Sequence, residues 1–249
     1  MSFVQTDSLH PGFSIDCVVF GYHQKSLQVL LLKLKSTEAW ALPGGFLEKD
    51  RDVDEEAVQI LRERTGLDKI FLQQFHLFGD VGRSSTDHIK NLLKKGIIKK
   101  EHEFWFKQRF LTIGYYALID FSRIQQMTPD HLSESCSFYP VSDLPTLILD
   151  HKKIISQAHS TLKRALNNEP IGINLLPVRF TMPELQGLYE TILEKKLDRR
   201  NFARRIKNYD IIKPAVLKSA GKLNKGSHLY EFDRSKYHEA LELGFHSGW

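Results

Sequence analysis

The residues with the clearest chemical potential form a basic segment near the end of the 249-residue chain. Between Lys195 and Lys225 there are 11 lysine and arginine residues, opposed only by Asp198 and Asp210. At about 100° per residue, a helix that begins after Asp198 turns Phe202 and Ile206 to one buried face. Its other sides carry the candidate DNA contacts: Arg199, Arg200, Asn201, Arg204, Arg205, Lys207 and Asn208. Arginine reads guanine edges, asparagine reads adenine edges and lysine neutralises phosphate, so this helix suits the major groove.

The distribution of charge favours the same interpretation. Through Glu169 the chain has 21 basic and 21 acidic residues, whereas residues 170–249 have 14 and 9, so the whole excess of +5 lies in the last third. Such an asymmetry is typical of a module that binds a polyanion. The alternative is a solvated basic face. A solvated face would normally mix acids with bases, and no acid occurs from Arg199 to Tyr209.

The elements around the basic helix predict a winged helix. Thr181 caps an expected helix with Pro183 in its first turn, and Glu184 completes a capping box. A short junction leads to the basic helix, and short strands are expected at 211–217 and 228–232. The loop between these strands adds three candidate DNA contacts, Lys218, Lys222 and Lys225. Helix, junction, helix, strand, basic loop, strand is the order of a winged helix-turn-helix domain.

A second group of residues could bind a small ligand. Pro43-Gly44-Gly45 allows close backbone approach to a phosphate or another polar group near the start of a following helix. Trp40 could stack on a base or sugar, and Arg83 could pair with an anion or with Asp80. The alternatives are that the glycines serve only the turn and that Trp40 is a core residue. The full candidate set is Trp40, Gly44, Gly45, Glu63, Asp80 and Arg83.

Strands and helices alternate in the first two thirds of the chain. Apolar segments predict strands at 13–22, 27–34, 70–79, 108–121 and 137–145. Helices are expected from Asp52, as N-cap, to Thr65 before Gly66, and from Asp150 to Leu166. Residues 84–106 form an inserted loop. The polar Asn167–Pro170 stretch predicts a boundary between a mixed α/β domain, residues 1–167, and the winged helix, residues 168–249.

Several classes of protein are disfavoured by the composition. No apolar run is long enough for a transmembrane span, and the first residues lack the pattern of a signal peptide. Cys17 and Cys136 cannot form a disulfide framework and lack zinc-ligand spacing. The eleven histidines form no ligand cluster. We therefore expect a cytoplasmic protein without a metal site, a cofactor or a membrane partner.

Residues 42–67 resemble a Nudix box, the metal-binding motif of a large family of pyrophosphate-cleaving enzymes. Gly45, Leu61, Glu63 and the closing Gly66-Leu67 match the family pattern. Its other acidic and paired positions are occupied here by Arg51, Gln59, Ile60 and Arg64. Cleavage in that family requires divalent metal held by clustered helix carboxylates. The resemblance therefore implies a degenerate Nudix domain that does not catalyse the reaction.

Both domains together resemble the Nudix-related, NrtR-like transcriptional regulators of bacteria, from about residue 12 to residue 232. The resemblance is carried by five segments: WALPGGF at 40–46, ERTGL at 63–67, LFGD followed by Arg83, GYYALID at 114–120 and the long segment at 180–206. It implies a homodimer, a double-stranded operator and an effector bound in the Nudix-type domain. Some members respond to ADP-ribose, and an AraR-type branch with eroded boxes responds to arabinose. The altered box and the long insertion favour an arabinose-like sugar over ADP-ribose.

Three hypotheses therefore stand at the level of sequence. The first is a ligand-responsive transcription regulator. The second is an active Nudix hydrolase of ADP-ribose or of a related nucleoside diphosphate derivative. The third is a nucleic-acid-binding scaffold whose Nudix-like part only dimerises. Cleavage of ADP-ribose would favour the second, and DNA affinity indifferent to metabolites would favour the third.

Overall fold

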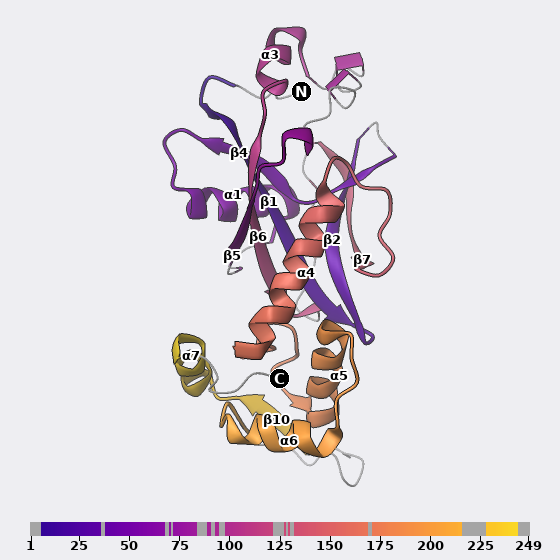
Figure 1. Cartoon of the computed structure of the whole chain (residues 1–249), viewed down its shortest axis with the longest axis vertical. Coiled ribbons are helices and arrows are strands. Elements are labelled where there is room, and N and C mark those ends of the chain that lie inside the picture. Colours follow the sequence, from indigo (N-terminus) through magenta and orange to yellow (C-terminus); the bar gives the residue numbers. More distant parts are fainter. Residues whose placement is uncertain are drawn as a thin grey trace. The chain divides into compact units, whose positions relative to one another are not determined.

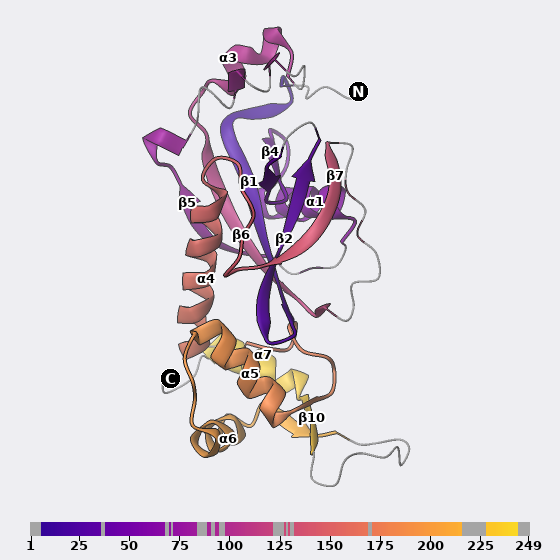
Figure 2. The same cartoon turned by 90° about the vertical axis from the view of Figure 1, so that its right-hand side faces the viewer.

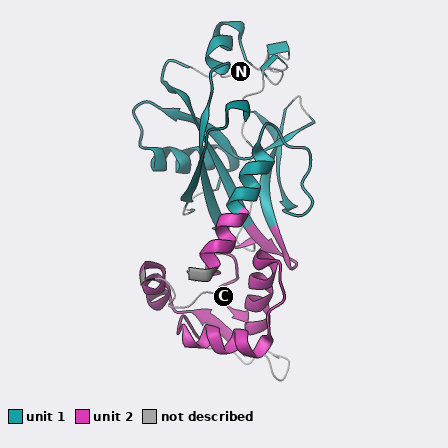
Figure 3. Cartoon of the chain, viewed as in Figure 1, with its two compact units in different colours: residues 1–20, 28–118, 125–158 teal, residues 21–27, 119–124, 159–249 magenta. Residues whose placement is uncertain are grey.

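The structure is a computed structural model of the chain and describes most of its residues. The described residues are 6–35, 38–67, 70, 72–83, 89–90, 93–94, 98–121, 127, 129, 132–168, 171–215 and 228–243. The chain forms two compact units (Figure 3). The first comprises residues 1–20, 28–118 and 125–158, and the second residues 21–27, 119–124 and 159–249. None of the helices in the described ranges is long and apolar enough to cross a bilayer.

A seven-stranded sheet forms the centre of the first unit (Figure 1). Its hydrogen-bonded order is β3 (Trp40–Ala41), β2 (Ser26–Leu34), β1 (Leu9–His23), β6 (Leu111–Ile119) and β5 (Leu72–Phe78). Strand β4 (Gly44–Glu48) pairs antiparallel with β1, and β7 (Ser133–Pro140) pairs antiparallel with β2. The strand predictions are confirmed apart from their ends. Ile15–Phe20 are nearly all inaccessible to solvent because both faces of β1 are covered.

Helices α1 (Val53–Thr65) and α4 (His151–Asn168) cover opposite faces of this sheet (Figure 2). Two consecutive residues of β1 show this arrangement, because neighbouring side chains of a strand point to opposite faces of the sheet. Cys17 Sγ contacts the carbonyl of Ala57 in α1, whereas Asp16 faces His151 in α4. Gly66 ends α1 in the left-handed conformation, as predicted. Asp52 occupies the N-cap position, as predicted, although its side chain makes no capping hydrogen bond.

Short helical turns precede and end the insertion in the same unit. Residues Val81–Arg83 form the 3-10 turn η1, Lys100–His102 form η2, and α3 spans Glu103–Phe106. The ring of Phe46 meets the rings of Trp105, Phe106 and Phe110 in edge or tilted contacts. The end of the insertion is therefore packed on β4 through aromatic rings, while much of residues 84–97 lies outside the described residues.

The second unit contains two helices and a small sheet. Helix α5 (Met182–Leu193) precedes α6 (Arg199–Asn208), and β10 (Leu229–Phe232) lies between β8 (Phe180–Thr181) and β9 (Ile212–Pro214). Its core is apolar and includes residues from each helix: Phe180, Leu185, Leu188, Tyr189, Ile192, Phe202 and Ile206. The order confirms the predicted winged helix. A further helix, α7 (Arg234–Leu243), was not predicted.

Both N-caps predicted for these helices are present. The Thr181 hydroxyl accepts a hydrogen bond from the Glu184 amide, and the Glu184 carboxylate accepts one from the Thr181 amide. Asp198 Oδ1 accepts a hydrogen bond from the Asn201 amide at 2.8 Å. These local contacts fix where α5 and α6 begin and therefore which α6 side chains face the core.

The second unit also contains chain segments from far upstream. The Thr191 hydroxyl in α5 donates to the carbonyl of Lys25 at 3.3 Å, and the rings of His23 and Phe121 stack 4.5 Å apart. His159, in the part of α4 that belongs to this unit, hydrogen-bonds to the carbonyl of Ile192. Each compact unit is built from several separate segments of the chain. The single domain boundary after residue 167 therefore stays a prediction.

Candidate functional site

Helix α6 has the two-faced character expected from the sequence. Phe202 and Ile206 are 2% and 0% exposed, and the Phe202 ring packs edge-on against Tyr189 of α5 at 5.4 Å. Arg200, Arg204 and Asn208 belong to the exposed residues on the other side. The buried pair anchors the helix, so the opposite stripe is held outward as a rigid surface.

The cations of α6 differ from those of the neighbouring elements in their partners. Lys196 pairs with Glu190 at 2.9 Å, Lys163 with Glu194 and Lys236 with Asp210. Within the described part of the chain, three cations of α6 form neither an ion pair nor a side-chain hydrogen bond: Arg199, Arg200 and Lys207. Glu190, Glu194 and Asp210 are therefore neutralised by lysines outside α6, and the positive charge of α6 faces outward.

Glu190 illustrates how completely a neighbouring acid is occupied. Its carboxylate accepts hydrogen bonds from the Leu197 amide, from Lys196 and from Gln186. These contacts, the Leu197 amide foremost, lower the pKa of Glu190 to about 2. The carboxylate stays ionised but tied to the junction before α6, so it is not available to the arginines of α6.

Three of the predicted DNA contacts, Arg205, Arg204 and Asn201, have internal partners. Arg205 donates from Nε to the Tyr209 hydroxyl at 2.7 Å, and its guanidinium lies 6.0 Å from the centre of that ring. Arg204 donates to the Asn201 side-chain oxygen at 3.0 Å, which fixes both side chains on one turn. The structure therefore places Arg205 at the edge of the exposed stripe. Lys218, Lys222 and Lys225 lie outside the described residues.

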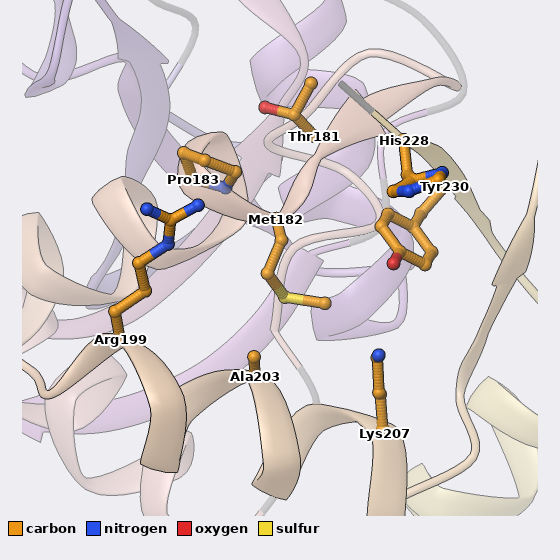
Figure 4. A pocket seen from close by; sticks show the side chains of 8 residues that line it. All are labelled: Thr181, Met182, Pro183, Arg199, Ala203, Lys207, His228 and Tyr230. Atoms are coloured by element: carbon orange, nitrogen blue, oxygen red, sulfur yellow. The ribbon is translucent and has the colours of Figure 1, made fainter. Parts of the chain in front are cut away.

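A pocket that was not predicted from the sequence opens beside α6. It has a volume of about 290 Å³ and lies between the start of α5, one side of α6 and strand β10 (Figure 4). Its lining is Thr181, Met182, Pro183, Arg199, Ala203, Lys207, His228 and Tyr230. Figure 4 shows Met182 between the two helices and Lys207 directed toward Tyr230. These residues come from β8, α5, α6 and the start of β10 with the residue before it, so only folding brings them together.

In the first unit, the two glycines of the predicted turn have packing roles. A Cβ on Gly44 would collide with the Asp16 carboxylate and lie 2.9 Å from the carbonyl of Ile15. A Cβ on Gly45 would lie 3.0 Å from the Ile60 side chain. Trp40 packs edge-on against Tyr139 at 4.8 Å, with the Lys33 ammonium 5.9 Å from its ring. The sequence analysis predicted that a ligand would lie close to the backbone at these glycines. In the structure, side chains and backbone of the protein itself occupy that space.

The helix positions that would hold metal in a Nudix enzyme are engaged in other contacts. Arg64 donates from Nε to the carbonyl of Gly44 at 2.8 Å, and Gln59 donates to Glu63 at 2.5 Å. Arg51 pairs with the largely buried Glu56 at 3.2 Å. Among the described residues, no three or more His, Cys, Asp or Glu side chains gather as a set of metal ligands. An arginine therefore lies where a carboxylate would be needed.

Arg83 has a different partner from the one predicted. Its guanidinium forms a two-pronged ion pair with Asp150, Nε to Oδ2 and Nη2 to Oδ1, both at 3.0 Å. It also donates to the carbonyl of Phe110 and to the Thr112 hydroxyl. The predicted pairing with the Asp80 side chain is wrong, because Asp80 pairs with Lys153. Only 5% of the Arg83 side chain is exposed, so an anionic ligand would have to displace Asp150.

The sequence did not predict a buried acid–base pair beneath the glycine turn. His151 Nε2 lies 3.7 Å from Asp16 Oδ1, and His151 Nδ1 accepts a hydrogen bond from the Leu42 amide at 2.9 Å. Burial raises the pKa of Asp16 and lowers the pKa of His151, while the attraction between the two partly opposes both shifts. The available signal was the single carboxylate within the apolar segment FSIDCVVF at 13–20.

Comparisons with known proteins show which family the chain is similar to. Residues 172–232 match the family model described as the NrtR DNA-binding winged helix domain. The "ADPR responsive transcriptional repressor NtrR" of Acinetobacter baylyi is 30% identical over 241 residues, which cover 94% of this chain and 86% of that protein. The chain belongs to the NrtR-like family of Nudix-related transcriptional regulators.

Further relatives of this NrtR-like regulator agree on its architecture. The crystal structure of Shewanella oneidensis NrtR complexed with a 27mer DNA has a TM-score of 0.71 and 23% identity, covering 95% of this chain and 99% of that one. An "ADP-ribose pyrophosphatase" of Methanocaldococcus jannaschii is 25% identical over 150 residues, 59% of this chain and 72% of that protein. The predicted family and the fold, a Nudix-like mixed sheet followed by a winged helix, are confirmed. The comparisons do not support the AraR-type branch.

Proposed function

We propose that this NrtR-like regulator binds double-stranded operator DNA through α6 and responds to ADP-ribose bound by its Nudix-like unit. The observation that carries the DNA-binding part is the set of cations on α6, Arg199, Arg200 and Lys207, that face outward without an ion pair in the described structure. Arg200 and Arg204 would reach base edges in the major groove. Asn208, on the same stripe, would add an amide suited to adenine.

A homodimer with one α6 per subunit would read a palindromic operator. Its half-sites would be about one or two helical turns apart, because each recognition helix must enter the major groove from the same side. The proposal of a homodimer comes from the family resemblance, since the structure contains a single chain. Sedimentation of the protein with and without a selected duplex measures the stoichiometry directly.

ADP-ribose is the effector favoured by the relatives, since the Acinetobacter protein is named for its response to it and the Methanocaldococcus protein for cleaving it. The residues of the altered Nudix box suit binding without cleavage. Arg64, held against the Gly44 carbonyl, supplies a fixed positive charge where a catalytic domain would hold a divalent cation. A diphosphate would then be bound by charge and backbone amides, without metal.

The first test selects bound duplexes from a random library and then titrates the complex with ADP-ribose. We expect selection of a palindrome, and release of the duplex by ADP-ribose in the presence of EDTA as well as of Mg²⁺. L-arabinose is the second ligand of the panel, because the sequence alone favoured a sugar. Release by arabinose and not by ADP-ribose would refute the proposed effector, and failure to enrich any duplex would refute the DNA-binding function.

A second candidate function is hydrolysis of ADP-ribose, which the similarity to a pyrophosphatase favours. Incubation with ADP-ribose and Mg²⁺, followed by chromatography for AMP, decides between the two. We expect no AMP. Release of AMP that is lost in Glu63→Gln would establish the hydrolase, since Glu63 is the one carboxylate that matches the family motif.

A further inference from the structure

The lining of the pocket beside α6 combines cationic and apolar side chains. Arg199 and Lys207 contribute the charge, while Met182, Pro183 and Ala203 contribute the apolar surface. His228 and Tyr230 add polar atoms from β10 and the residue before it. No acidic side chain belongs to the lining. Three acids are next to lining residues in sequence, and each has another partner: Glu184 binds Thr181, Asp198 binds the Asn201 amide and Glu231 pairs with Lys213. A lining of this kind selects an anion attached to an apolar body.

The position of the pocket on α6 indicates which anion. Arg199, Ala203 and Lys207 are spaced four residues apart and form one stripe along the helix. Arg200 and Arg204 form the adjacent stripe, which we have assigned to base edges. A helix with its side chains is about 10–12 Å across, and the major groove is about 12 Å wide. A helix that points one stripe at the bases must therefore bring its flanking stripe against the sugar–phosphate wall of the groove.

We propose that this pocket seats one backbone phosphate of the duplex, with its deoxyribose, at the edge of the major groove entered by α6. Lys207 and Arg199 neutralise the phosphate, and the sugar lies on Met182 and Ala203. The pocket fixes the register of α6 on the duplex without reading sequence. This inference rests on the DNA-binding function proposed above, and it divides α6 into a reading stripe and an anchoring stripe.

The test measures the affinity of the whole protein for its selected duplex and for an unrelated duplex over a range of salt concentrations. Each neutralised phosphate contributes about 0.9 to the slope of log K against log salt. Lys207→Gln is expected to flatten that slope by about this amount and to weaken both duplexes equally, about fivefold at 0.15 M salt. Ala203→Leu, which fills the pocket without changing the charge, is expected to weaken both duplexes as well.

Two control variants distinguish a phosphate contact in the pocket from other losses of affinity. Lys236→Gln removes a lysine of the same unit that is paired with Asp210 outside the pocket, and we expect an unchanged slope. Arg204→Ala removes a residue of the reading stripe, and we expect a loss that is larger for the selected duplex. Circular dichroism and urea unfolding verify that each variant is folded before its affinity is interpreted.

Three results would overturn the inference. An unchanged slope in Lys207→Gln would show that the pocket holds no phosphate of the duplex. A loss confined to the selected duplex would make Lys207 a reader of bases. Weaker binding of ADP-ribose, with unchanged duplex binding, in Ala203→Leu would assign the pocket to a free nucleotide. Absence of binding to any duplex would refute the proposed function together with this inference.

Discussion

Arg64 Nε donates a hydrogen bond to the carbonyl oxygen of Gly44 at 2.8 Å. This contact joins α1 to the first residue of β4 at the position where the Nudix motif places its chemistry. A guanidinium has no acceptor atom and stays charged at any pH the protein meets, so it cannot ligate a cation. Arg64, a residue that departs from the Nudix motif, is thus also a structural contact between the helix and the strand.

We expect Arg64→Ala to destabilise the protein and to leave it unable to cleave ADP-ribose. A hydrogen bond from a charged donor contributes about 1.5–3 kcal/mol, and part of that is screened here because Arg64 is only part-buried. Urea unfolding measures the loss, with Arg62→Ala on the same helix as the control. Equal stability of Arg64→Ala and the parent protein would contradict the role of this contact.

Gly44→Ala is expected to cost about 1–3 kcal/mol, because its Cβ would overlap the Asp16 carboxylate and the Ile15 carbonyl oxygen. Neither group can move away easily, since Asp16 is buried and Ile15 belongs to the central strand. Gly82→Ala is the matched control, because a Cβ at Gly82 meets nothing within 4 Å. Thermal unfolding of the two variants side by side compares them. A larger loss in Gly82→Ala would show that the turn is packed differently.

Removal of Arg83 should be the most damaging single change in the first unit. It would leave the mostly buried Asp150 without its two-pronged partner, and breaking a buried ion pair from one side costs about 3–5 kcal/mol. Lys153→Ala breaks the neighbouring pair with Asp80, which is solvent-exposed, and should have little effect. The difference between the two urea midpoints tests the prediction. Similar midpoints would mean that Asp150 finds water or another donor.

The stability of the protein should fall as the pH drops below about 6.5, in part because of His151. Burial lowers the pKa of this histidine, so near pH 6 the unfolded chain binds a proton that the folded protein does not bind. The buried Asp16, whose pKa is raised, acts in the opposite direction because its protonated form is favoured by folding. Asp150 and Arg83 also face the histidine, with opposite effects on its pKa.

His151→Asn is the variant that tests this dependence. Its side-chain oxygen can still accept the hydrogen bond of the Leu42 amide, but it does not titrate. Urea unfolding at pH 7.5 and pH 5.5 should show a smaller loss of stability in the variant than in the parent protein. His159, whose pKa burial also lowers, remains in both proteins and sets the residual dependence. An equal loss in both would assign the effect to other groups.

Arg204→Ala and Arg200→Ala are expected to weaken binding of the selected duplex by about 1–3 kcal/mol each, if each reads one base. They should also relax the choice of base at one position per half-site. Arg205→Ala should have a smaller effect, since its guanidinium is held by Tyr209. Repeating the selection with each variant measures the relaxed position. Unchanged affinity in both Arg204→Ala and Arg200→Ala would show that α6 does not enter the groove.

The local elements could be predicted because their causes are local. Thr181 with Glu184, Asp198 and Gly66 mark where helices begin or end through contacts within a few residues, and all three are found as expected. The position of Phe202 and Ile206 follows from helical periodicity. Asp52 shows the limit of this reasoning, because a suitable residue at the cap position makes no capping bond in the folded chain.

The partners of the charged side chains were decided by tertiary structure. Arg83 had Asp80 three residues away, yet its guanidinium binds Asp150, because folding brings η1 next to the residue that precedes α4. His151 and Asp16 are 135 residues apart in sequence, and nothing local links them. A long side chain can reach several partners, so its pairing depends on which elements the core brings close.

By itself, the sequence determined the two kinds of domain, the eroded metal motif and the helix that carries the unbalanced positive charge. These depend on residue type and spacing, which are the same in any conformation. The tertiary structure decided that Lys163, Lys196 and Lys236 neutralise nearby acids while the described cations at Arg199, Arg200 and Lys207 face outward. It also formed the pocket from α5, α6 and β10, because a cavity exists only where packed elements fail to fill the space between them.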